Sequence, residues 1–375
     1  WVAIVSLWSS LEGSILFWGA MLGVYVLGSV YDLGDEHPEH LPYFLGVLLA
    51  CGVFFSFLLA GPANPFLAVP NPLSEGPGPN PLLQNHILMI IHPPMLYAGY
   101  VGMTVPFSLA MSALFAGNLG ADFVPRLRRW LLIPWIFLTA GVVLGGWWAY
   151  EVLGWGGYWD WDPVENASFF PWLTATAALH SVVVVGRRGA LKVWTVTLVL
   201  ATFLLTILGT FMTRSGVFNS VHSFTQSDIG PTFLIFLAIC FIVVIVTLAA
   251  RMDKLAQRNK IRDLKSREAM FLLNNLFFVL FTFTVVIGTV FPLLVEAVKG
   301  VKISVGSPYF NAMSVPLGVG ILFLMGVGPA LPWGAASWPR LRKALLPPLI
   351  GSFAALAIAL PLGLRNGWAL ATCFA

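Results

Sequence analysis

Residues 231–250 of the chain read PTFLIFLAICFIVVIVTLAA, a run of 20 residues without a charged side chain that ends at Arg251. A helix of about 20 apolar residues is long enough to cross the hydrocarbon core of a bilayer. Of all 375 residues, 58% are hydrophobic and only 10% are charged, whereas soluble domains carry about 25% charged residues. These values predict a protein whose surface faces lipid, and they exclude a soluble globular domain.

Similar apolar runs recur along the whole chain. Gly and Pro inside several of them are compatible with transmembrane helices, and polar and apolar residues do not alternate as they do in membrane barrels. We therefore predict an all-α fold, a polytopic membrane helical bundle with irregular outer loops, built by residues 1–375 as a single domain. The predicted spans are 12–30, 41–60, 92–116, 130–147, 172–186, 193–212, 231–250, 271–290, 315–333 and 346–364.

Lys and Arg are distributed unevenly between the two sets of connecting loops. One set holds sixteen of them, and the other holds only Arg214, Lys299 and Lys302. Because cytoplasmic loops carry the excess of basic residues, the second set, which includes loops 61–91 and 213–230, is predicted to face the periplasm. We expect the basic segment 251–268 to be a solvated cytoplasmic surface helix, and no nucleic-acid-binding module is visible in it.

The chain starts without Met and stops inside an apolar stretch. We expect both ends to be cut rather than natural termini.

The outer loop 145–171 is dense in tryptophan and glycine. Five of the fifteen tryptophans lie between residues 147 and 161, interspersed with Gly154, Gly156 and Gly157. An interfacial aromatic belt is one interpretation, but a belt spreads tryptophans over many helix ends. Indole faces beside permissive backbone favour a large planar ligand instead. The residues of this loop that we predict to bind it are Trp147, Trp148, Trp155, Trp159, Trp161, Asp162, Pro163, Glu165 and Asn166.

The same loop carries four carboxylates, Glu151, Asp160, Asp162 and Glu165, and no basic residue. Paired carboxylates can perform acid–base chemistry. Alternatively, they cap helices by accepting backbone N–H bonds, as Asp162 followed by Pro163 and Glu165 would do at a helix start. We favour capping, and the sequence identifies no certain catalytic residue.

Three histidines occupy positions that suggest a function. His92 stands at the start of the third predicted span, before two prolines, and His222 lies in loop 213–230. Taken alone, a His at the position of His92 is more often a capping or interfacial residue. His180 lies about 12 Å of helix into the fifth span, where an ionisable side chain is a functional hypothesis. Neutral imidazole is a common ligand of haem iron. The alternative for His180 is a hydrogen bond to a neighbouring helix.

The remaining polar candidates are less informative. Arg214 could contact a lipid headgroup or pair with an anionic group such as a propionate. His37 and His40 lie in an acidic cytoplasmic loop and are expected to be solvated, and His86 has no setting that suggests a function.

Residues 155–166, WGGYWDWDPVEN, resemble the signature of the haem-handling WWD family, which includes CcmF, CcmC and the CcsA-type synthetases. Three further segments resemble the CcmF type in particular. They are NPLLQ at 80–84 with HPPMLY at 92–97, GTF at 209–211 with RSGV at 214–217, and SVHSF at 220–224. The likeness extends in the same order from about Glu12 to at least Asn311.

This resemblance implies a haem lyase component of cytochrome c-type biogenesis. Such a protein receives haem from the chaperone CcmE, holds it on the WWD loop and supports its thioether attachment to the CxxCH motif of apocytochrome c. By position, His92 and His222 match the outer haem ligands, and His180 matches the first ligand of a transmembrane haem b. No His follows His222, so either the chain is cut before the second ligand or that site is lacking.

The resemblance also implies a bacterial inner membrane, a periplasmic active face, and CcmH and CcmI-type subunits as partners beside the lipid bilayer. Quinol is a candidate electron donor. One rival function is a haem carrier without ligation chemistry. A cytochrome b-like electron carrier is disfavoured because no helix carries a suitable His pair, and a secondary transporter is disfavoured because no internal repeat is evident.

Overall fold

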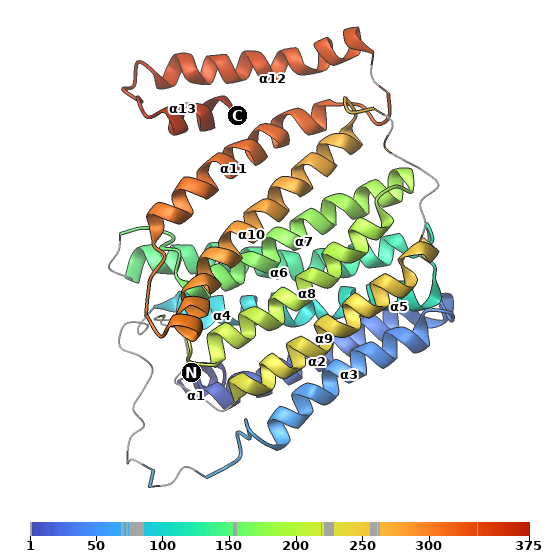
Figure 1. Cartoon of the computed structure of the whole chain (residues 1–375), viewed down its shortest axis with the longest axis vertical. Coiled ribbons are helices and arrows are strands. Elements are labelled where there is room, and N and C mark those ends of the chain that lie inside the picture. Colours follow the sequence, from blue (N-terminus) through green and yellow to red (C-terminus); the bar gives the residue numbers. More distant parts are fainter. Residues whose placement is uncertain are drawn as a thin grey trace. The chain divides into compact units, whose positions relative to one another are not determined.

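Figure 1 shows the computed structural model of the chain. It describes residues 2–68, 71–72, 74, 86–152, 156–218, 220, 229–255, 261, 263–335 and 337–375. These residues form helices and turns, and no strand occurs among them. The α-helices are α1 (Val2–Ser9), α2 (Leu11–Leu33), α3 (Leu41–Ala60), α4 (Ile87–Gly102), α5 (Thr104–Ala116), α6 (Val124–Val152), α7 (Pro163–Arg188), α8 (Lys192–Arg214), α9 (Ile229–Arg251), α10 (Arg267–Lys299), α11 (Ser307–Val327), α12 (Trp338–Ala359) and α13 (Gly367–Phe374).

Within the described chain, ten helical segments are long and apolar enough to cross a membrane. Each overlaps one predicted span, so the all-α membrane fold is confirmed and the chain is a multi-pass membrane protein. The third span is divided at Met103 between α4 and α5. Pro106 has no N–H to offer the carbonyl four residues earlier, and this gap interrupts the helical ladder at the division.

The start of the third span was predicted wrongly. Helix α4 begins at Ile87, and His86 caps it by accepting the Leu88 N–H at 3.2 Å through Nδ1. Pro93 and Pro94 therefore lie inside the helix, and His92 is more than one turn from its start. Internal prolines are tolerated in membrane helices because neighbouring groups satisfy the freed carbonyls.

The boundaries of the predicted Trp-rich loop 145–171 were also too wide. Helix α6 continues through Trp147 and Trp148 to Val152, and α7 already begins at Pro163. The glycines near residue 145 suggested loop, since Gly weakens an isolated helix. Packing of α6 on α4 overrides that local tendency.

Helices α4 and α6 run side by side (Figure 1) and approach closely through glycines. A Cβ atom added at Gly99 would lie 2.8 Å from the backbone of Leu138, and one added at Gly141 would lie 2.6 Å from the Leu96 side chain. Small residues let membrane helices approach at backbone distance. This contact places His92 of α4 opposite Gly145 of α6.

By its internal contacts the chain divides into two compact units. Unit 1 consists of Trp1–Ala175 and Val196–Ala256, and unit 2 of Thr176–Thr195 and Gln257–Ala375. The division passes through α7 and α8, so each of these helices contributes to both units. The single domain for residues 1–375 stays a prediction.

Buried polar groups join the helices of unit 1. Tyr100 donates its hydroxyl to the Ala167 carbonyl at 2.7 Å, which ties α4 to the start of α7. Thr202 of α8 donates to Thr174 of α7 at 2.9 Å. In a bilayer such bonds replace the water that the groups would otherwise bind.

Unit 2 is built around α10 and α11, which pack against each other. A Cβ atom at Gly288 would lie 2.7 Å from the ring of Phe310, and one at Gly320 would lie 2.4 Å from that of Phe277. Close packing at small residues therefore recurs in this unit.

The predicted solvation of His37 and His40 was wrong, because both are buried, with 3% and 0% of their surfaces exposed. His40 stacks on Phe123 with 4.0 Å between ring centroids. His37 Nε2 lies 2.7 Å from the Arg126 guanidinium, which also binds Glu36. Burial lowers the pKa of His40 because it disfavours the charged ring. These residues fasten the loop before α3 to the start of α6.

The described part of the basic segment 251–268 is not one continuous surface helix. Met252–Leu255 form a 3₁₀ helix, and Ser266 caps α10 by accepting the Ala269 N–H at 3.2 Å. Glu268, in the first turn, is buried, pairs with Arg188 and accepts the Gly334 N–H. The end of the segment is thus packed rather than solvated.

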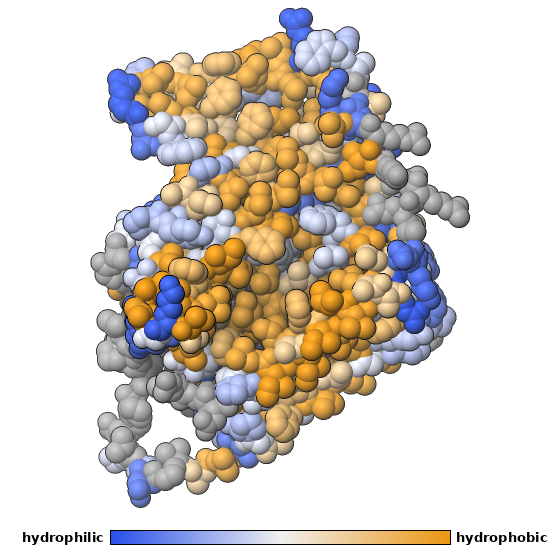
Figure 2. All heavy atoms as spheres, in the orientation of Figure 1, coloured by the Kyte–Doolittle hydropathy of each residue, from blue (hydrophilic) through white to orange (hydrophobic). Residues whose placement is uncertain are grey.

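Helix α9 shows how the molecule meets lipid. The band that it occupies in Figure 1 is hydrophobic in Figure 2. Its exposed side chains include Leu234, Ile235, Ile239, Phe241, Ile242, Val243, Ile245 and Val246. Such a face is stable only in contact with apolar surroundings.

Candidate functional site

The side chain of His92 lies against α6 in a recess at Gly141 and Gly145, which we call the seat of His92. A Cβ atom at Gly145 would lie 2.5 Å from His92 Cε1, so only glycine leaves room for the ring. His92 Nδ1 lies 2.7 Å from the carbonyl oxygen of Gly141. A carbonyl only accepts hydrogen bonds, so Nδ1 carries the proton and Nε2 carries the lone pair. This is the tautomer in which histidine binds a metal ion through Nε2.

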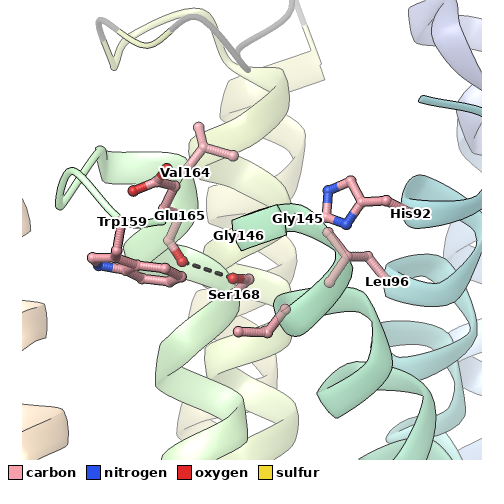
Figure 3. A pocket seen from close by; sticks show the side chains of 9 residues that line it. His92, Leu96, Gly145, Gly146, Trp159, Val164, Glu165 and Ser168 are labelled. Carbon is pink, nitrogen blue, oxygen red and sulfur yellow. Dashed lines mark hydrogen bonds between the residues drawn. The ribbon is translucent and has the colours of Figure 1, made fainter. Parts of the chain in front are cut away.

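A small cavity of about 50 Å³ adjoins this seat. Figure 3 shows His92 and Trp159 on opposite sides of it, with Glu165 and Ser168 of α7 between them. Its volume suits a few water molecules, so a porphyrin could not enter it. Its lining residues are His92, Leu96, Val142, Gly145, Gly146, Trp159, Val164, Glu165 and Ser168.

The predicted tryptophans form two groups. Trp148 is buried on α6, with its ring centroid 5.7 Å from that of His92. Trp159 packs edge-on against Trp161 at 6.1 Å and against Phe169 at 5.5 Å. The indole N–H groups of Trp148 and Trp159 are buried and find no hydrogen-bond acceptor within the described residues. Unused buried donors of this kind are rare in proteins. Trp155 lies outside the described residues.

A second aromatic surface at the end of α6 is open. The rings of Tyr150 and Tyr158 stack with 4.5 Å between their centroids, and both residues are more than half exposed. Trp147 is half exposed. Large exposed aromatic patches mark binding sites more often than isolated exposed residues do.

The carboxylates of the loop build a reciprocal cap at the start of α7. Asp162 Oδ1 accepts the N–H groups of Val164 at 2.8 Å and Glu165 at 3.3 Å. Glu165 Oε2 accepts those of Asp160 at 3.0 Å and Asp162 at 3.3 Å. This arrangement is a capping box, with Pro163 at the first helical position. The capping interpretation of these two residues is confirmed.

Trp161 is held in an unusual backbone conformation. Its φ of 59° is in the left-handed region, which costs a non-glycine residue free energy. Asn166, fully buried on α7, donates to the Trp161 carbonyl at 2.9 Å. The cap and this bond together fix the direction in which the Trp159–Trp161 stretch enters α7.

The loop that carries His222 is connected to this cap. Ser220 donates to Asp162 Oδ1 at 2.7 Å, and it precedes His222 by two residues in the sequence. His222 itself lies outside the described residues, so its predicted role as a ligand stays a prediction.

Sequence reasoning missed a polar cluster at the outer ends of α4 and α6. His86 Nε2 lies 2.6 Å from Glu151 Oε2, and Trp147 donates its indole N–H to the other oxygen of Glu151. The four-residue spacing of Trp147 and Glu151 was a usable signal, because such residues share a helix face. The contact with His86 spans 65 residues and has no local signal.

Arg214 is buried at the end of α8, with only 3% of its surface exposed. It donates to Ser14 at 3.2 Å and to the Tyr97 hydroxyl at 3.0 Å. Its guanidinium carbon lies 5.5 Å from the ring centroids of both Trp18 and Tyr97. This position does not support the headgroup interpretation, which requires exposure.

His180 lies on the part of α7 that belongs to unit 2. Its ring stacks on Phe271 at 5.2 Å and lies 5.8 Å from that of Phe278. The side-chain nitrogen of Asn274 on α10 is 3.3 Å from His180 Nδ1. The predicted contact with a neighbouring helix is therefore present, and it does not occupy Nε2.

A family model described as "Cytochrome C assembly protein" matches residues 8–218, which is more than half of the chain. The chain belongs to the cytochrome c assembly protein family. The match covers His92, His180, the Trp-rich stretch and Arg214, whereas the α10 residues that contact His180 lie beyond it.

Individual relatives of this cytochrome c assembly protein agree with the predicted CcmF resemblance. It is 40% identical over 95% of its length to "Cytochrome c-type biogenesis protein ccl1" of Rhodobacter capsulatus and covers 54% of that protein. It is 41% identical over 94% of its length to CcmF of Pseudomonas aeruginosa, again covering 54%. The chain is also 39% identical to CcmF of Escherichia coli over 96% of its own length, and it covers 56% of that protein.

A solved structure titled "Cytochrome c Heme Lyase CcmF" has the same fold. It superposes with a TM-score of 0.80 and 40% identity, over 99% of this chain and 55% of that one. The CcmF-type resemblance is confirmed. The chain spans about half the length of the curated relatives that it matches.

Proposed function

We propose that this cytochrome c assembly protein is a CcmF-type haem lyase component, with haem as the substrate of its outer site. The observation that carries the proposal is the seat of His92, where Gly145 admits the ring and the Gly141 carbonyl holds the proton on Nδ1. Nε2 would then ligate the haem iron from one face. His222 is the proposed ligand from the other, on its sequence position alone.

The tryptophans would support the porphyrin. Because the cavity beside His92 is too small for it, haem would lie against the aromatic side chains that border the cavity. The capping box of Asp162 and Glu165 would keep Trp159 and Trp161 in place. Arg214 is the proposed propionate contact, and two of its five N–H groups already bind Ser14 and Tyr97.

The reaction would be the addition of cysteine thiols to the haem vinyl groups. Each sulfur forms a bond to one vinyl carbon and the thiol proton goes to the other, so the step consumes no oxidant. The residues of this chain would not react in it. They would hold haem and the CxxCH segment of apocytochrome c in register, which is the protein's usual contribution to cofactor chemistry.

The proposed partners follow from this reaction. CcmE would deliver haem, CcmH and CcmI-type subunits would present apocytochrome c, and quinol is a candidate electron donor. The protein would reside in a bacterial inner membrane. Since the basic residues gather in the other set of loops, the outer ends of α4 and α6 would face the periplasm.

His180 is proposed as a ligand of a resident haem b, with the second ligand supplied from outside these 375 residues. The surroundings fit such a group, because Phe271 and Phe278 provide an apolar, aromatic environment and the contact of Asn274 is with Nδ1 rather than Nε2. Bound there, haem b would supply one-electron redox chemistry, used to keep the substrate haem reduced.

The variant His92→Gly tests the outer site. In cells that express the full-length protein with its partners, we expect His92→Gly to reduce covalent cytochrome c by more than about tenfold, as expected for removal of a metal ligand. Added imidazole should restore part of it, because the small ligand can occupy the vacated space. Trp338→Ala, at an exposed site in unit 2, is the control. Normal maturation in His92→Gly would refute the proposal.

The alternative function is a haem carrier without ligation chemistry. It predicts that the protein binds haem through His92 and that thioether bonds still form when the protein is replaced by another haem source. Haem transferred from purified CcmE to the protein, followed by thioether formation on a CxxCH peptide, would favour the lyase.

A further inference from the structure

Asn274 of α10 has an unsatisfied side chain beside His180. It is buried, with 5% of its surface exposed, and its Oδ1 atom finds no hydrogen-bond partner among the described residues. Its Nδ2 atom lies 3.3 Å from His180 Nδ1. Both nitrogens can donate, so in this orientation the pair is satisfied only if the imidazole proton is on Nε2.

Ligation of iron through Nε2 places the His180 proton on Nδ1, and this requires the Asn274 amide to be rotated by 180° from this orientation. The oxygen and nitrogen of an amide have nearly the same shape, and the hydrogen-bond network decides between the two orientations. After rotation, Oδ1 faces Nδ1 and accepts its proton, and Nδ2 takes the position that Oδ1 held. The His180 proton then resides on Nδ1, and Nε2 carries the lone pair.

The neighbouring Asn275 also joins α10 to α7, without contacting the imidazole of His180. In its better-satisfied orientation Asn275 donates to the carbonyls of Phe271 at 3.2 Å and Ala177 at 3.1 Å, and accepts from Ser181 at 2.7 Å. Ala177 and Ser181 flank His180 on α7. Two consecutive asparagines of α10 therefore bind the same stretch of α7, one through backbone and hydroxyl groups and the other through the imidazole.

We propose that Asn274 is a positioning residue for His180. Its carboxamide oxygen accepts the Nδ1 proton, fixes the ring rotation and presents Nε2 to iron. This inference rests on the proposed role of His180 as a haem b ligand. Histidines that bind metals commonly donate their other N–H to such an acceptor, and the bond makes them stronger ligands.

The hydrogen bond has an electrochemical consequence. An acceptor at Nδ1 increases electron density on Nε2, which stabilises ferric over ferrous haem and lowers the reduction potential. Asn274→Leu keeps the approximate volume and removes the acceptor, so it should raise the potential. Asn274→Asp offers a stronger acceptor and should lower it. A tenfold change in the ratio of ferric to ferrous binding constants corresponds to about 59 mV for one electron.

The experiment uses full-length protein purified with its haem b. Redox titration of the reduced-minus-oxidised spectrum should give a higher potential for Asn274→Leu than for the wild type, and a lower one for Asn274→Asp. Asn274→Leu should also lose haem about tenfold faster than the wild type. Asn275→Leu is the matched control, because it breaks the adjacent contact between α7 and α10 without touching the imidazole. It should leave the potential unchanged.

Three results would overturn the proposed role of Asn274. Equal shifts in Asn274→Leu and Asn275→Leu would show a packing effect and overturn the inference, as would an unchanged potential in Asn274→Leu. If the leucine variant does not fold, a potential in Asn274→Asp that is unchanged or higher overturns it equally. His180→Ala separates the two hypotheses: full haem b content in that variant refutes the proposed ligand itself, whatever Asn274 does.

Discussion

His92 and His180 are held by different kinds of hydrogen-bond partner. For His92 the acceptor is a backbone carbonyl on α6, 49 residues away in sequence, and a glycine provides the space for the ring. For His180 the partner is a side chain on α10, 94 residues away. A backbone acceptor survives almost any substitution, whereas a side-chain acceptor can be adjusted by a single mutation. The position of His92 is therefore set by helix packing and that of His180 by residue identity.

Disturbing the helix packing at His92 should have the largest effect. In Gly145→Ala the new Cβ would meet the imidazole at about 2.5 Å, so the ring must leave its seat or the helices must separate. Overpacking of this kind costs roughly 1–3 kcal/mol. We expect cytochrome c maturation to fall about tenfold or more, measured by haem staining of the product.

Gly23→Ala is the control for this substitution, because a Cβ there would meet no atom within 4 Å. If Gly145→Ala matures cytochrome c as well as Gly23→Ala does, the seat of His92 is not required.

Removing the cap of α7 should have an intermediate effect. Asp162→Ala leaves the N–H groups of Val164 and Glu165 without their acceptor, and loss of a cap costs about 1 kcal/mol. Asp162→Asn keeps an acceptor oxygen and should retain most of the stability, as measured by thermal unfolding in detergent.

The asparagine variant also separates the two interpretations of this carboxylate. If Asp162→Asn is as stable as the wild type but blocks maturation, the negative charge has a chemical role, and the acid–base interpretation returns.

The smallest expected effect is a pH dependence of stability that arises at the buried His40. The pKa of His40 is lowered in the folded protein because the ring is buried, although Glu39 and Asp122 act in the opposite direction and His37 adds to the lowering. A lowered folded-state pKa means that the unfolded chain binds the proton more readily. The stability from neutral His40 is therefore complete above the ordinary pKa of about 6.5 and decreases as pH falls below it.

This dependence can be measured by thermal unfolding at pH 7.5 and pH 5.5. His40→Phe, which keeps a ring stacked on Phe123, should lose less stability on acidification than the wild type. An identical decrease in both proteins would assign the titration to other groups.

The site could be predicted in part from the sequence. The capping box was visible because Asp162, Pro163 and Glu165 are neighbours, and helix capping depends on a four-residue pattern. The setting of His92 was recognised, but its seat was not, because Gly145 was assigned to the Trp-rich loop rather than to a helix that packs on His92. The contacts of His86 with Glu151 and of His180 with Asn274 join residues 65 and 94 positions apart, and no local pattern encodes such pairs.

The sequence by itself determined the ten membrane segments, because the transfer of about 20 apolar residues into lipid depends on composition and length alone. It also carried the Trp-rich signature and the cap of α7. Only the tertiary structure decided where α6 ends, why His37 and His40 are buried, and which groups the rings of His92 and His180 contact. These properties depend on which helices pack together, and packing is set by the fit between surfaces that are distant in the chain.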